Sequence, residues 1–351
     1  MKVLISPLKA QSMVNQALLV KRLLNENTID AEIKSYIGIN DVVNPENTHF
    51  IWMTLAAVDF LIDITPSYFL TRKSRVVYVT IEGYPIPVTF KDTNIPKIEF
   101  IANSEFTKKC LERAKLKVKD VVHHAVDASI VEKNKDYFER VRQAIKSAYK
   151  NRVLFLYVGR HDPRKGLEYL AQAVKILNET HKDKYVLLLH TNESARELFQ
   201  ESNTLIIGKF GSRTYEQVMS LYYAADYIVF PSVCEGFGLP VLEANAVGRP
   251  VIHCWFEPLS EFSSKEFNFV FNYAEVQYVK NMWRQYWIFH VYDPTWLADM
   301  MKYAIDVYLN SKEEYQEYCE KAKEHAANWD YHKVYPKLLK HLGIHVVSTN
   351  V

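Results

Sequence analysis

The chain has 351 residues, about twice the common domain size, which predicts two domains that each bury a core of their own. Apolar residues make up 48% of the chain and charged residues 24%, which excludes a disordered or collagen-like protein. A balance of 43 basic against 41 acidic residues argues against nucleic acid as a partner, because a phosphate backbone requires an excess of positive charge.

Cysteine usage and hydropathy narrow the class further. The cysteines show no CxxC pair, so neither a zinc site nor a disulfide framework is indicated; they are Cys110, Cys234, Cys254 and Cys319. The N-terminal stretch lacks the apolar core of a signal peptide, and no run of about eighteen uncharged apolar residues predicts a membrane span. A cytoplasmic protein without a bound metal is therefore expected.

Short apolar runs alternate with amphipathic stretches, which is the pattern of βα units around a parallel sheet. In the first half, residues 12–25 carry apolar side chains at helical spacing. Ser104 caps a helix toward Lys115, with Glu105 in the first turn, where a carboxylate suits the helix dipole. The strands expected in this half are residues 3–5, 50–54, 75–80, 97–102 and 118–123.

A polar helix over residues 132–150 separates this half from the apolar run 152–158, and we place the domain boundary near residue 150. The rhythm then repeats, with strands expected over 185–190, 204–207, 226–230 and 250–253. The tail from 299 to 342 is expected to be helical with a break at 328–330. The predicted domains are residues 1–150, residues 151–325, and a C-terminal helix over 326–351 that packs back on the first domain.

Residues 267–290 interrupt this rhythm with an aromatic-rich segment that carries Trp283, Tyr286 and Trp287. Aromatic side chains usually pack into cores, so we expect a helix whose aromatics face the interior. Peripheral contact with a membrane surface, or docking of an acceptor, is the alternative interpretation.

The first motif with chemical content is YVGRHDPRKGLEYLAQAV, residues 157–174. A buried strand ends at Gly159, and a helix begins near Gly166 after a turn through Pro163. Arg160 and Lys165 thus lie at the positive end of a helix dipole, which is unfavourable by about 0.3 to 1 kcal/mol unless an anion is bound there. A diphosphate is the ligand that this arrangement favours. The alternative is that both are surface charges paired with Asp162 or Glu168.

The second motif, PSVCEGFGLPVLEANAVGRPVI at residues 231–252, follows an apolar strand, where open α/β sheets bind ligands. Gly236 and Gly238 leave the backbone N–H groups around them open to close approach by a ligand. Pro240 suits the first turn of the next helix. Glu235 and Glu243 are then predicted to face one cleft, where carboxylates accept pairs of hydrogen bonds from vicinal sugar hydroxyls. The other explanation for Glu243 is an acidic residue favoured in a helix's first turn.

These motifs resemble those of a known family. EGFGLPVLE is similar to the E-x7-E motif of retaining family 4 glycosyltransferases, and GR with RKG at residues 159–166 resembles their diphosphate-binding segment. The resemblance is strong over residues 152–255 and faint in the first hundred residues. It implies the GT-B fold, two Rossmann-like doubly wound α/β domains facing across a cleft, and transfer of a hexose with retention.

The resemblance also assigns roles. Arg160 and Lys165 would hold the diphosphate of a UDP- or GDP-sugar and stabilise the leaving nucleotide without a required metal. Glu243 would accept from the ribose hydroxyls. Glu235 would bind the transferred sugar together with backbone groups of the motif, namely those of Gly236, Phe237, Gly238 and Leu239.

The chain departs from the family pattern at two places in its first half. SPLKAQSM, residues 6–13, replaces the glycine-rich turn that members usually carry after the first strand, and it puts close approach of that loop to the donor phosphates in doubt. Glu82 stands where many members have a histidine after a strand, and it would orient an acceptor hydroxyl or stabilise an oxocarbenium-like sugar; a plain turn residue is the alternative. His123 and His124 have no metal-ligand spacing and are expected to be structural or solvent-facing.

The sequence thus predicts a glycosyltransferase acting on a saccharide, lipid-linked or protein acceptor. A GT-B epimerase or phosphorylase, or a non-catalytic sugar-nucleotide binding protein, would share the architecture and stays open. A dinucleotide oxidoreductase is disfavoured, because no GxGxxG fingerprint follows a strand.

Overall fold

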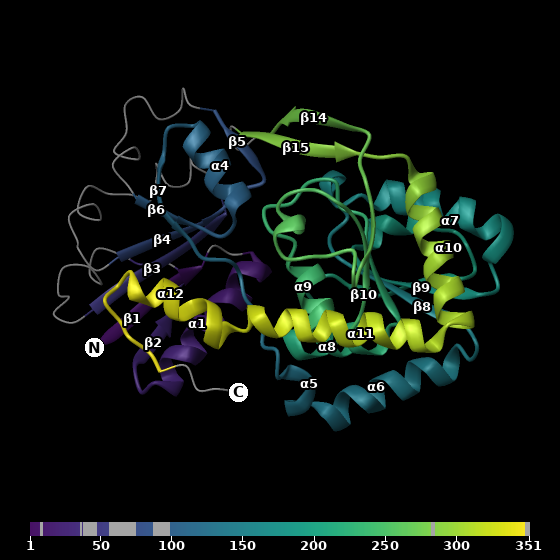
Figure 1. Ribbon diagram of the computed structural model, residues 1–351, viewed down its shortest axis with the longest axis horizontal. Helices are drawn as coiled ribbons and strands as arrows, with labels where there is room; N and C mark the ends of the chain where they lie inside the picture. The colour runs from purple at the N-terminus through teal and green to yellow at the C-terminus, as the bar shows by residue number, and fades with distance from the viewer. Residues whose placement is uncertain are drawn as a thin grey trace. The chain divides into compact units, whose positions relative to one another are not determined.

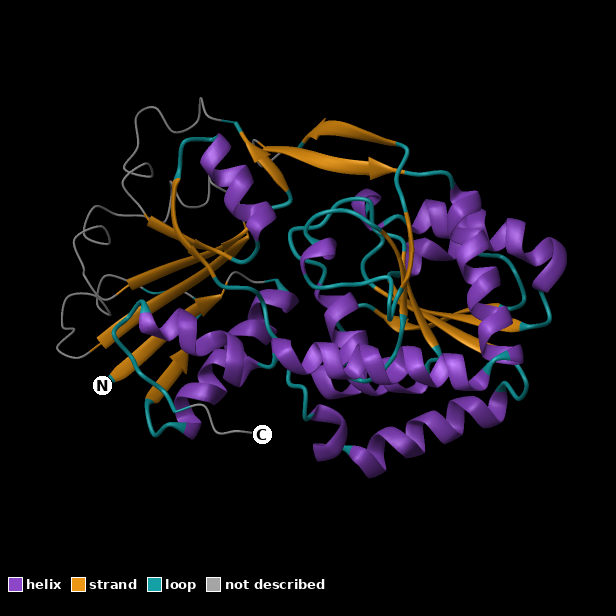
Figure 2. Ribbon diagram, viewed as in Figure 1, coloured by secondary structure: helices purple, strands orange, loops and turns teal. Residues whose placement is uncertain are grey.

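The computed structural model describes residues 1–7, 10–35, 37, 48–55, 75–86, 99–281 and 285–347. The chain divides into two compact units (Figure 1). Unit 1 comprises Met1–Val126, Tyr278–Ile288 and Trp329–Val351, and unit 2 comprises Asp127–Gln277 and Phe289–Asn328. Each unit holds a six-stranded sheet flanked by helices (Figure 2), and the predicted fold class of two Rossmann-like α/β domains is confirmed.

The sheet of unit 1 is parallel throughout. Its strand order is β2 (Asp30–Ile33), β1 (Lys2–Pro7), β3 (Thr48–Leu55), β4 (Arg75–Thr80), β6 (Glu99–Ala102) and β7 (Lys117–Val121). Successive side chains of a strand point to opposite faces, so each buried strand supplies two cores. Tyr78 lies in one core and its neighbours Val77 and Val79 in the other.

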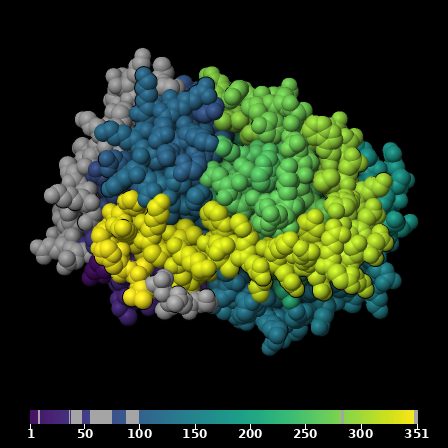
Figure 3. Space-filling view, viewed as in Figure 1, coloured from purple at the N-terminus to yellow at the C-terminus, as the bar shows by residue number. Residues whose placement is uncertain are grey.

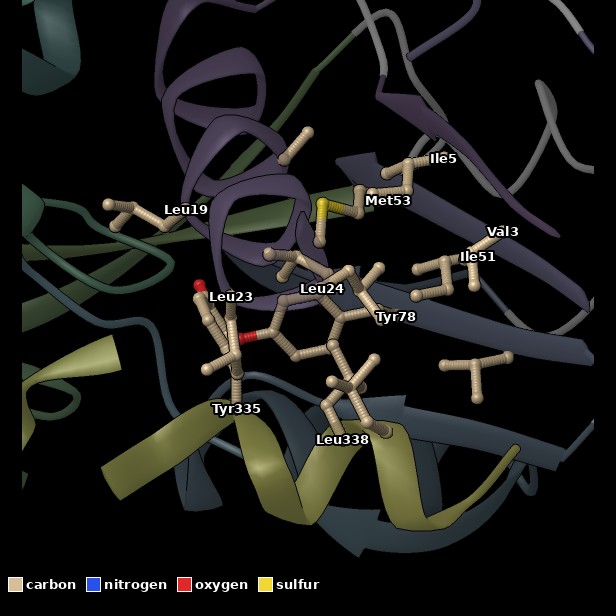
Figure 4. Close-up of a cluster of buried hydrophobic side chains, with 14 of the residues drawn as sticks. Val3, Ile5, Leu19, Leu23, Leu24, Ile51, Met53, Tyr78, Tyr335 and Leu338 are labelled. Atoms are coloured by element: carbon tan, nitrogen blue, oxygen red, sulfur yellow. The ribbon is translucent and has the colours of Figure 1, made fainter. Parts of the chain in front are cut away.

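Helices cover both faces of this sheet. The first core lies under α1 (Gln11–Glu26) and α12 (Tyr331–Lys340), where Leu23, Leu24 and Leu338 pack against Ile51 and Tyr78 (Figure 4). The second core lies under α4 (Glu105–Arg113), and Ser104 caps α4 as predicted by accepting from the N–H of Thr107 at 3.0 Å. The C-terminal helix therefore completes the first core of unit 1.

A short strand, β5 (Gly83–Pro85), adds a separate sheet to unit 1. It pairs antiparallel with β15 (Gln285–Val291), which also pairs with β14 (Glu275–Lys280). A Cβ atom at Gly83 would lie 1.9 Å from the carbonyl oxygen of Tyr286, so glycine is required for this pairing.

The sheet of unit 2 is also parallel; four of its strands are fully buried, whereas the edge strand Thr204–Lys209 is only partly buried. Its strand order is β10 (Thr204–Lys209), β9 (Tyr185–Thr191), β8 (Val153–Val158), β11 (Tyr227–Phe230), β12 (Val251–Cys254) and β13 (Phe269–Phe271). Apolar runs of this kind are expected where helices cover both faces of a parallel sheet. The carboxyl ends of β8 and β11, the central strands, lead into the two sequence motifs.

The helices of unit 2 are α5 (Ile130–Lys133), α6 (Lys135–Ala148), α7 (Leu167–His181), α8 (Tyr215–Ala224), α9 (Leu239–Ala246), α10 (Pro294–Asn310) and α11 (Lys312–Ala326). Most side chains of α11 are exposed, and they lie at the surface of unit 2 in the view of Figure 3. The break expected at residues 328–330 falls between α11 and α12, as predicted.

Unit 2 begins at Asp127, before the domain boundary that the sequence predicts near residue 150. The reason is the attachment of α6. Arg142 on this helix donates to the carbonyls of Tyr223, Ala224 and Ala225 at 3.0 to 3.1 Å, and it pairs with the buried Asp226 at 3.3 Å. Lys146 pairs with the same carboxylate. The positive side chains of α6 thus bind the carbonyl groups and the carboxylate at the carboxyl end of α8, and these contacts attach α6 to unit 2.

The prediction of a core helix over residues 267–290 is wrong. In the residues that the structure describes, this segment forms β13, β14 and β15. Its aromatic and β-branched residues favour a pleated strand, and β14 is exposed along its length. Trp283 lies outside the described residues. Helix formation needs an apolar stripe at a spacing of 3.6 residues, and the aromatic content alone does not supply that period.

Candidate active site

The turn between β8 and α7 lies against the loop after β11. A short 3-10 turn, η4 (Pro163–Lys165), begins at Asp162, whose carboxylate accepts from the N–H of Arg164 at 3.2 Å. It ends at Gly166, which has a φ of +68°. A Cβ atom at Gly166 would lie 2.0 Å from the carbonyl oxygen of Pro231, so only glycine allows this approach. Lys165 is thereby held beside the second motif.

The loop from Pro231 to Gly238 is buried throughout and is fixed by its carbonyl groups. The hydroxyl of Tyr292 donates to the carbonyl of Pro231 at 2.7 Å. The N–H of His290 donates to the carbonyl of Val233 at 2.7 Å. Sequence reasoning missed both residues, because they lie in or just after the aromatic segment that was expected to be helical.

The glycines of this loop permit close packing before α9. Gly238 has a φ of +97°, and a Cβ atom there would lie 2.1 Å from Leu259 Cδ2. Phe237 stacks on Phe262 with 4.6 Å between ring centroids. α9 begins at Leu239 with Pro240 in its first turn, as predicted. Pro240 has no N–H, and the N–H of Val241 donates to the carbonyl of Gly238 at 3.0 Å. In the described residues, Leu239 is therefore the first-turn residue whose N–H can donate to an anion or a hydroxyl oxygen.

Lys165 and Glu235 meet at this point. Lys165 Nζ lies 2.5 Å from Glu235 Oε1, and the two side chains are only 17% and 6% exposed. The alternative pairing expected for Lys165, with Asp162 or Glu168, is absent among the described residues. Asp162 pairs with Arg164 at 3.4 Å, and Glu168 contacts His161 at 3.2 Å.

Glu243 is a buried carboxyl group in the second turn of α9. It does not lie in the first turn, so the expected placement at the helix start is corrected and the first-turn dipole does not explain the residue. Glu243 is only 7% exposed, and burial raises the pKa of its carboxyl group to about 7. Within the described ranges, this carboxyl makes no hydrogen bond or ion pair.

Arg160 follows the end of β8 and is exposed. The hydroxyl of Tyr157 donates to its carbonyl oxygen at 2.8 Å, which fixes the backbone where the strand ends. Its guanidinium makes no ion pair with any residue that the structure describes. Arg160, Lys165, Glu235 and Glu243 thus all belong to unit 2, on the loops and the helix that follow β8 and β11.

Glu82 belongs to unit 1, between β4 and β5, and is partly buried. Its backbone carbonyl accepts from the N–H of Ile288 at 3.4 Å. His124 lies in the same unit, and its ring nitrogens contact the hydroxyls of Tyr78 and Thr80 at 2.9 and 3.2 Å. Burial lowers the pKa of His124 to about 3, so the ring is neutral and structural, the first of the two alternatives expected from the sequence.

No cluster of three or more His, Cys, Asp or Glu side chains that could hold a metal ion occurs in the described part of the chain. The same residues include no helix of the length and hydropathy that a membrane span requires. The cysteines are free.

Comparisons with known proteins agree with this geometry. Residues 138–271 match the family model described as glycosyl transferases group 1. The chain is 26% identical over 280 residues to uncharacterized glycosyltransferase 335 of Sulfolobus islandicus rod-shaped virus 1, covering 78% of this chain and 82% of that relative. It is 38% identical over 103 residues to O-antigen chain mannosyltransferase B of Escherichia coli, covering 28% of this chain and 27% of the relative.

Solved structures share the fold. The structure of Anabaena HepE in complex with UDP-glucose superposes with a TM-score of 0.68 at 16% identity, over 98% of this chain and 99% of that one. A glycosyltransferase from Rickettsia africae gives a TM-score of 0.67 at 15% identity, over 97% of both chains.

The two doubly wound units and these matches define the chain as a glycosyltransferase of the GT-B fold. The part of it that matches the glycosyl transferases group 1 model includes Arg160, Lys165, Glu235 and Glu243.

Proposed function

We propose that unit 2 binds the nucleotide-sugar donor, a UDP- or GDP-hexose, at the loops after β8 and β11. The observation that carries the proposal is Glu243, a buried carboxyl that has no hydrogen-bond or ion-pair partner among the described residues. Burying such a group without a hydrogen bond is costly, and a fold retains it where a ligand supplies the partner. Vicinal ribose hydroxyls supply two donors to one carboxylate, which suits Glu243.

Lys165 and Arg160 bind the diphosphate in this proposal. Breaking the bond between the anomeric carbon and the phosphate oxygen leaves the electron pair, and a developing negative charge, on the nucleoside diphosphate. Cations fixed in place before the reaction stabilise that charge most effectively. The backbone of Lys165 is held by the turn at Gly166 and its ammonium by Glu235. The hydroxyl of Tyr157 holds the backbone of Arg160, whose side chain is exposed and can reach a bound phosphate. These two cations support transfer without a required metal.

Glu235 and the N–H groups from Gly236 to Leu239 bind the transferred sugar. The loop is buried and fixed through the carbonyls of Pro231 and Val233, so its polar groups keep one position. Fixed donors and a carboxylate match the alternating hydroxyl groups of a hexose. Two related proteins support a hexose, since the Escherichia coli relative is a mannosyltransferase and Anabaena HepE was crystallised with UDP-glucose.

Glu82 in unit 1 is proposed to orient the acceptor hydroxyl, and the transfer is proposed to proceed with retention at the anomeric carbon. Both rest on resemblance to family 4 enzymes and on the position of Glu82 after β4, at the carboxyl edge of its sheet. A saccharide, a lipid-linked sugar or a protein would serve as acceptor, and the last two allow peripheral contact with a membrane.

The test is sugar transfer itself. Purified protein is incubated with UDP-glucose, UDP-galactose, GDP-mannose or GDP-glucose and a panel of saccharide and lipid-linked acceptors, with and without EDTA. We expect release of one nucleoside diphosphate that depends on an acceptor, persists in EDTA, and yields a product with the donor's anomeric configuration by proton NMR. Release of free sugar without any acceptor would support an epimerase or hydrolase, and loss of activity in EDTA would overturn metal independence.

A further inference from the structure

Glu235 depends on Lys165 for the compensation of its charge. Its carboxylate is only 6% exposed, and in the described residues Lys165 is the cation that it contacts, at 2.5 Å. The ring of Phe230 lies 5.9 Å from the Lys165 ammonium, so an aromatic ring borders this largely buried pair. In such surroundings a carboxylate separated from its cation is strongly unfavourable.

The same ammonium is the one that the proposed function assigns to the donor diphosphate. Phosphate oxygens and the Glu235 carboxylate therefore compete for Lys165. A free nucleoside diphosphate that draws Lys165 toward itself leaves Glu235 buried beside a second negative charge. Its binding is weakened by that repulsion and by the lost ion pair.

A sugar attached to the diphosphate changes this balance. Its hydroxyl groups donate to a carboxylate, and hydrogen bonds to a charged acceptor are stronger than those between neutral groups. The sugar thus restores partners to Glu235 at the moment when the diphosphate takes Lys165. Binding of the sugar and binding of the diphosphate become mutually dependent.

We propose that Glu235 determines specificity between the nucleotide sugar and the free nucleoside diphosphate, weakening the binding of the reaction's own product. This inference rests on the proposed donor site and adds a selective role to the Lys165–Glu235 pair. A competing arrangement has Lys165, with its three N–H donors, bridge both groups, so that Glu235 orients the ammonium toward the phosphate. The two arrangements predict opposite effects of neutralising Glu235 on nucleotide binding.

The test is calorimetric titration of UDP and UDP-glucose, with GDP and GDP-mannose as the second pair, into wild type and Glu235→Gln. We expect Glu235→Gln to bind the free diphosphate at least about fivefold more tightly and the nucleotide sugar more weakly. The ratio of the two dissociation constants then shifts by at least about tenfold. Glu235→Ala is expected to shift the ratio in the same direction, and it replaces the glutamine variant if that variant does not fold.

Glu168→Gln is the matched control. Glu168 lies in the first turn of α7 and contacts His161 rather than Lys165, so its neutralisation removes the same charge near the same turn. We expect it to shift both ligands equally, leaving the ratio unchanged. Unchanged or weaker binding of the free diphosphate by Glu235→Gln, or equal shifts for both ligands, would overturn the inference.

Lys165→Ala separates this inference from the donor site on which it rests. If Lys165→Ala loses both ligands while Glu235→Gln leaves their ratio unchanged, the donor site stands and the selective role of Glu235 falls. If wild type binds neither pair, the donor site and the inference fall together.

Discussion

The polar side chains at the carboxyl edges of the two sheets differ in whether they have hydrogen-bond partners within the protein. In unit 1, these groups are bonded to each other. His124 contacts Tyr78 at 2.9 Å and Thr80 at 3.2 Å, and the hydroxyl of Thr107 donates to Asn103 at 2.7 Å. In unit 2, Glu243 is buried without an internal partner, and Glu235 contacts one cation, Lys165, within the described residues.

This difference distinguishes polar groups that stabilise the fold from polar groups that are proposed to bind the donor. A satisfied network contributes to the stability of the fold, since a buried polar group that loses its partner costs about 1 to 3 kcal/mol. An unsatisfied buried carboxyl opposes folding, and the donor proposed for unit 2 would supply the hydrogen-bond donors that Glu243 lacks. Substitutions of these groups in unit 1 should therefore mainly lower the free energy of unfolding, and those in unit 2 should mainly weaken donor binding.

The largest effect is expected at Gly166. Gly166→Ala places a Cβ atom 2.0 Å from the carbonyl oxygen of Pro231 at a φ of +68°, so the turn and the loop after β11 must separate. We expect a loss of at least about 3 kcal/mol in the free energy of unfolding, together with loss of donor binding. Denaturant unfolding and calorimetry measure both quantities.

Gly211→Ala is the control for that substitution. Gly211 has a comparable φ of +81°, but a Cβ atom there would meet no atom within 4 Å. The backbone strain alone should cost about 1 kcal/mol and leave donor affinity unchanged. Equal losses in the two variants would show that the contact between the turn and Pro231 does not matter.

Paired substitutions in the two units test the comparison directly. His124→Ala leaves the hydroxyls of Tyr78 and Thr80 without their ring partner, and we expect it to lower the free energy of unfolding by about 1 to 3 kcal/mol without changing donor affinity. Glu243→Ala should weaken donor binding at least about tenfold, equivalent to about 1.4 kcal/mol, with the smaller loss of stability. A strongly destabilised Glu243→Ala protein with normal donor affinity would reverse the assignment of the two units.

The pH dependence of donor binding sharpens the role of Glu243. Its pKa in the free protein is about 7, and the ionised form is the better acceptor for ribose hydroxyls. Affinity for UDP-glucose should therefore rise about tenfold between about pH 6 and pH 8. UDP-glucose is the suitable ligand, because its phosphates are diesters and, unlike a terminal phosphate, do not titrate near pH 6.

The raised pKa of Glu243 has the opposite effect on the pH dependence of stability: donor affinity rises with pH, and the free energy of unfolding of the free protein falls. The folded state raises the pKa of Glu243 above its unfolded value, so it binds more protons than the unfolded state between the two values. Glu243 thus lowers the free energy of unfolding as pH rises through this window toward about 7. Glu243→Gln should abolish both trends, and a Gln variant that retains them would assign them to another group.

Much of the fold and the site could be predicted from local patterns. The apolar runs that became β8 and β11 are short and lie before turn residues, as expected of buried parallel strands. The glycines and Pro240 marked the loop and the helix start that follow β11. These features depend on residues close together in the sequence. The placement of Lys165 beside Glu235 could be expected only through resemblance to a family, because 70 residues separate the two.

What escaped prediction depends on contacts between distant residues. The attachment of α6 to unit 2 rests on Arg142 and Asp226, which are 84 residues apart, and no local pattern records that pair. β14 and β15 were mistaken for a helix because the aromatic content of the segment was considered without its period. The hydrogen bonds to Val233 from His290 of β15, and to Pro231 from Tyr292 just after that strand, were missed as well.

The most direct test of the donor site is calorimetry with UDP-glucose and GDP-mannose on wild type and Lys165→Ala, with circular dichroism to verify folding. We expect wild type to bind one of the two donors. Because Lys165 contributes positive charge to the proposed diphosphate site and its side chain is largely buried, we expect Lys165→Ala to bind that donor at least about tenfold more weakly while remaining folded. Equal affinity in the two proteins, or no binding of either donor by wild type, would contradict the assignment of unit 2 as the donor-binding unit.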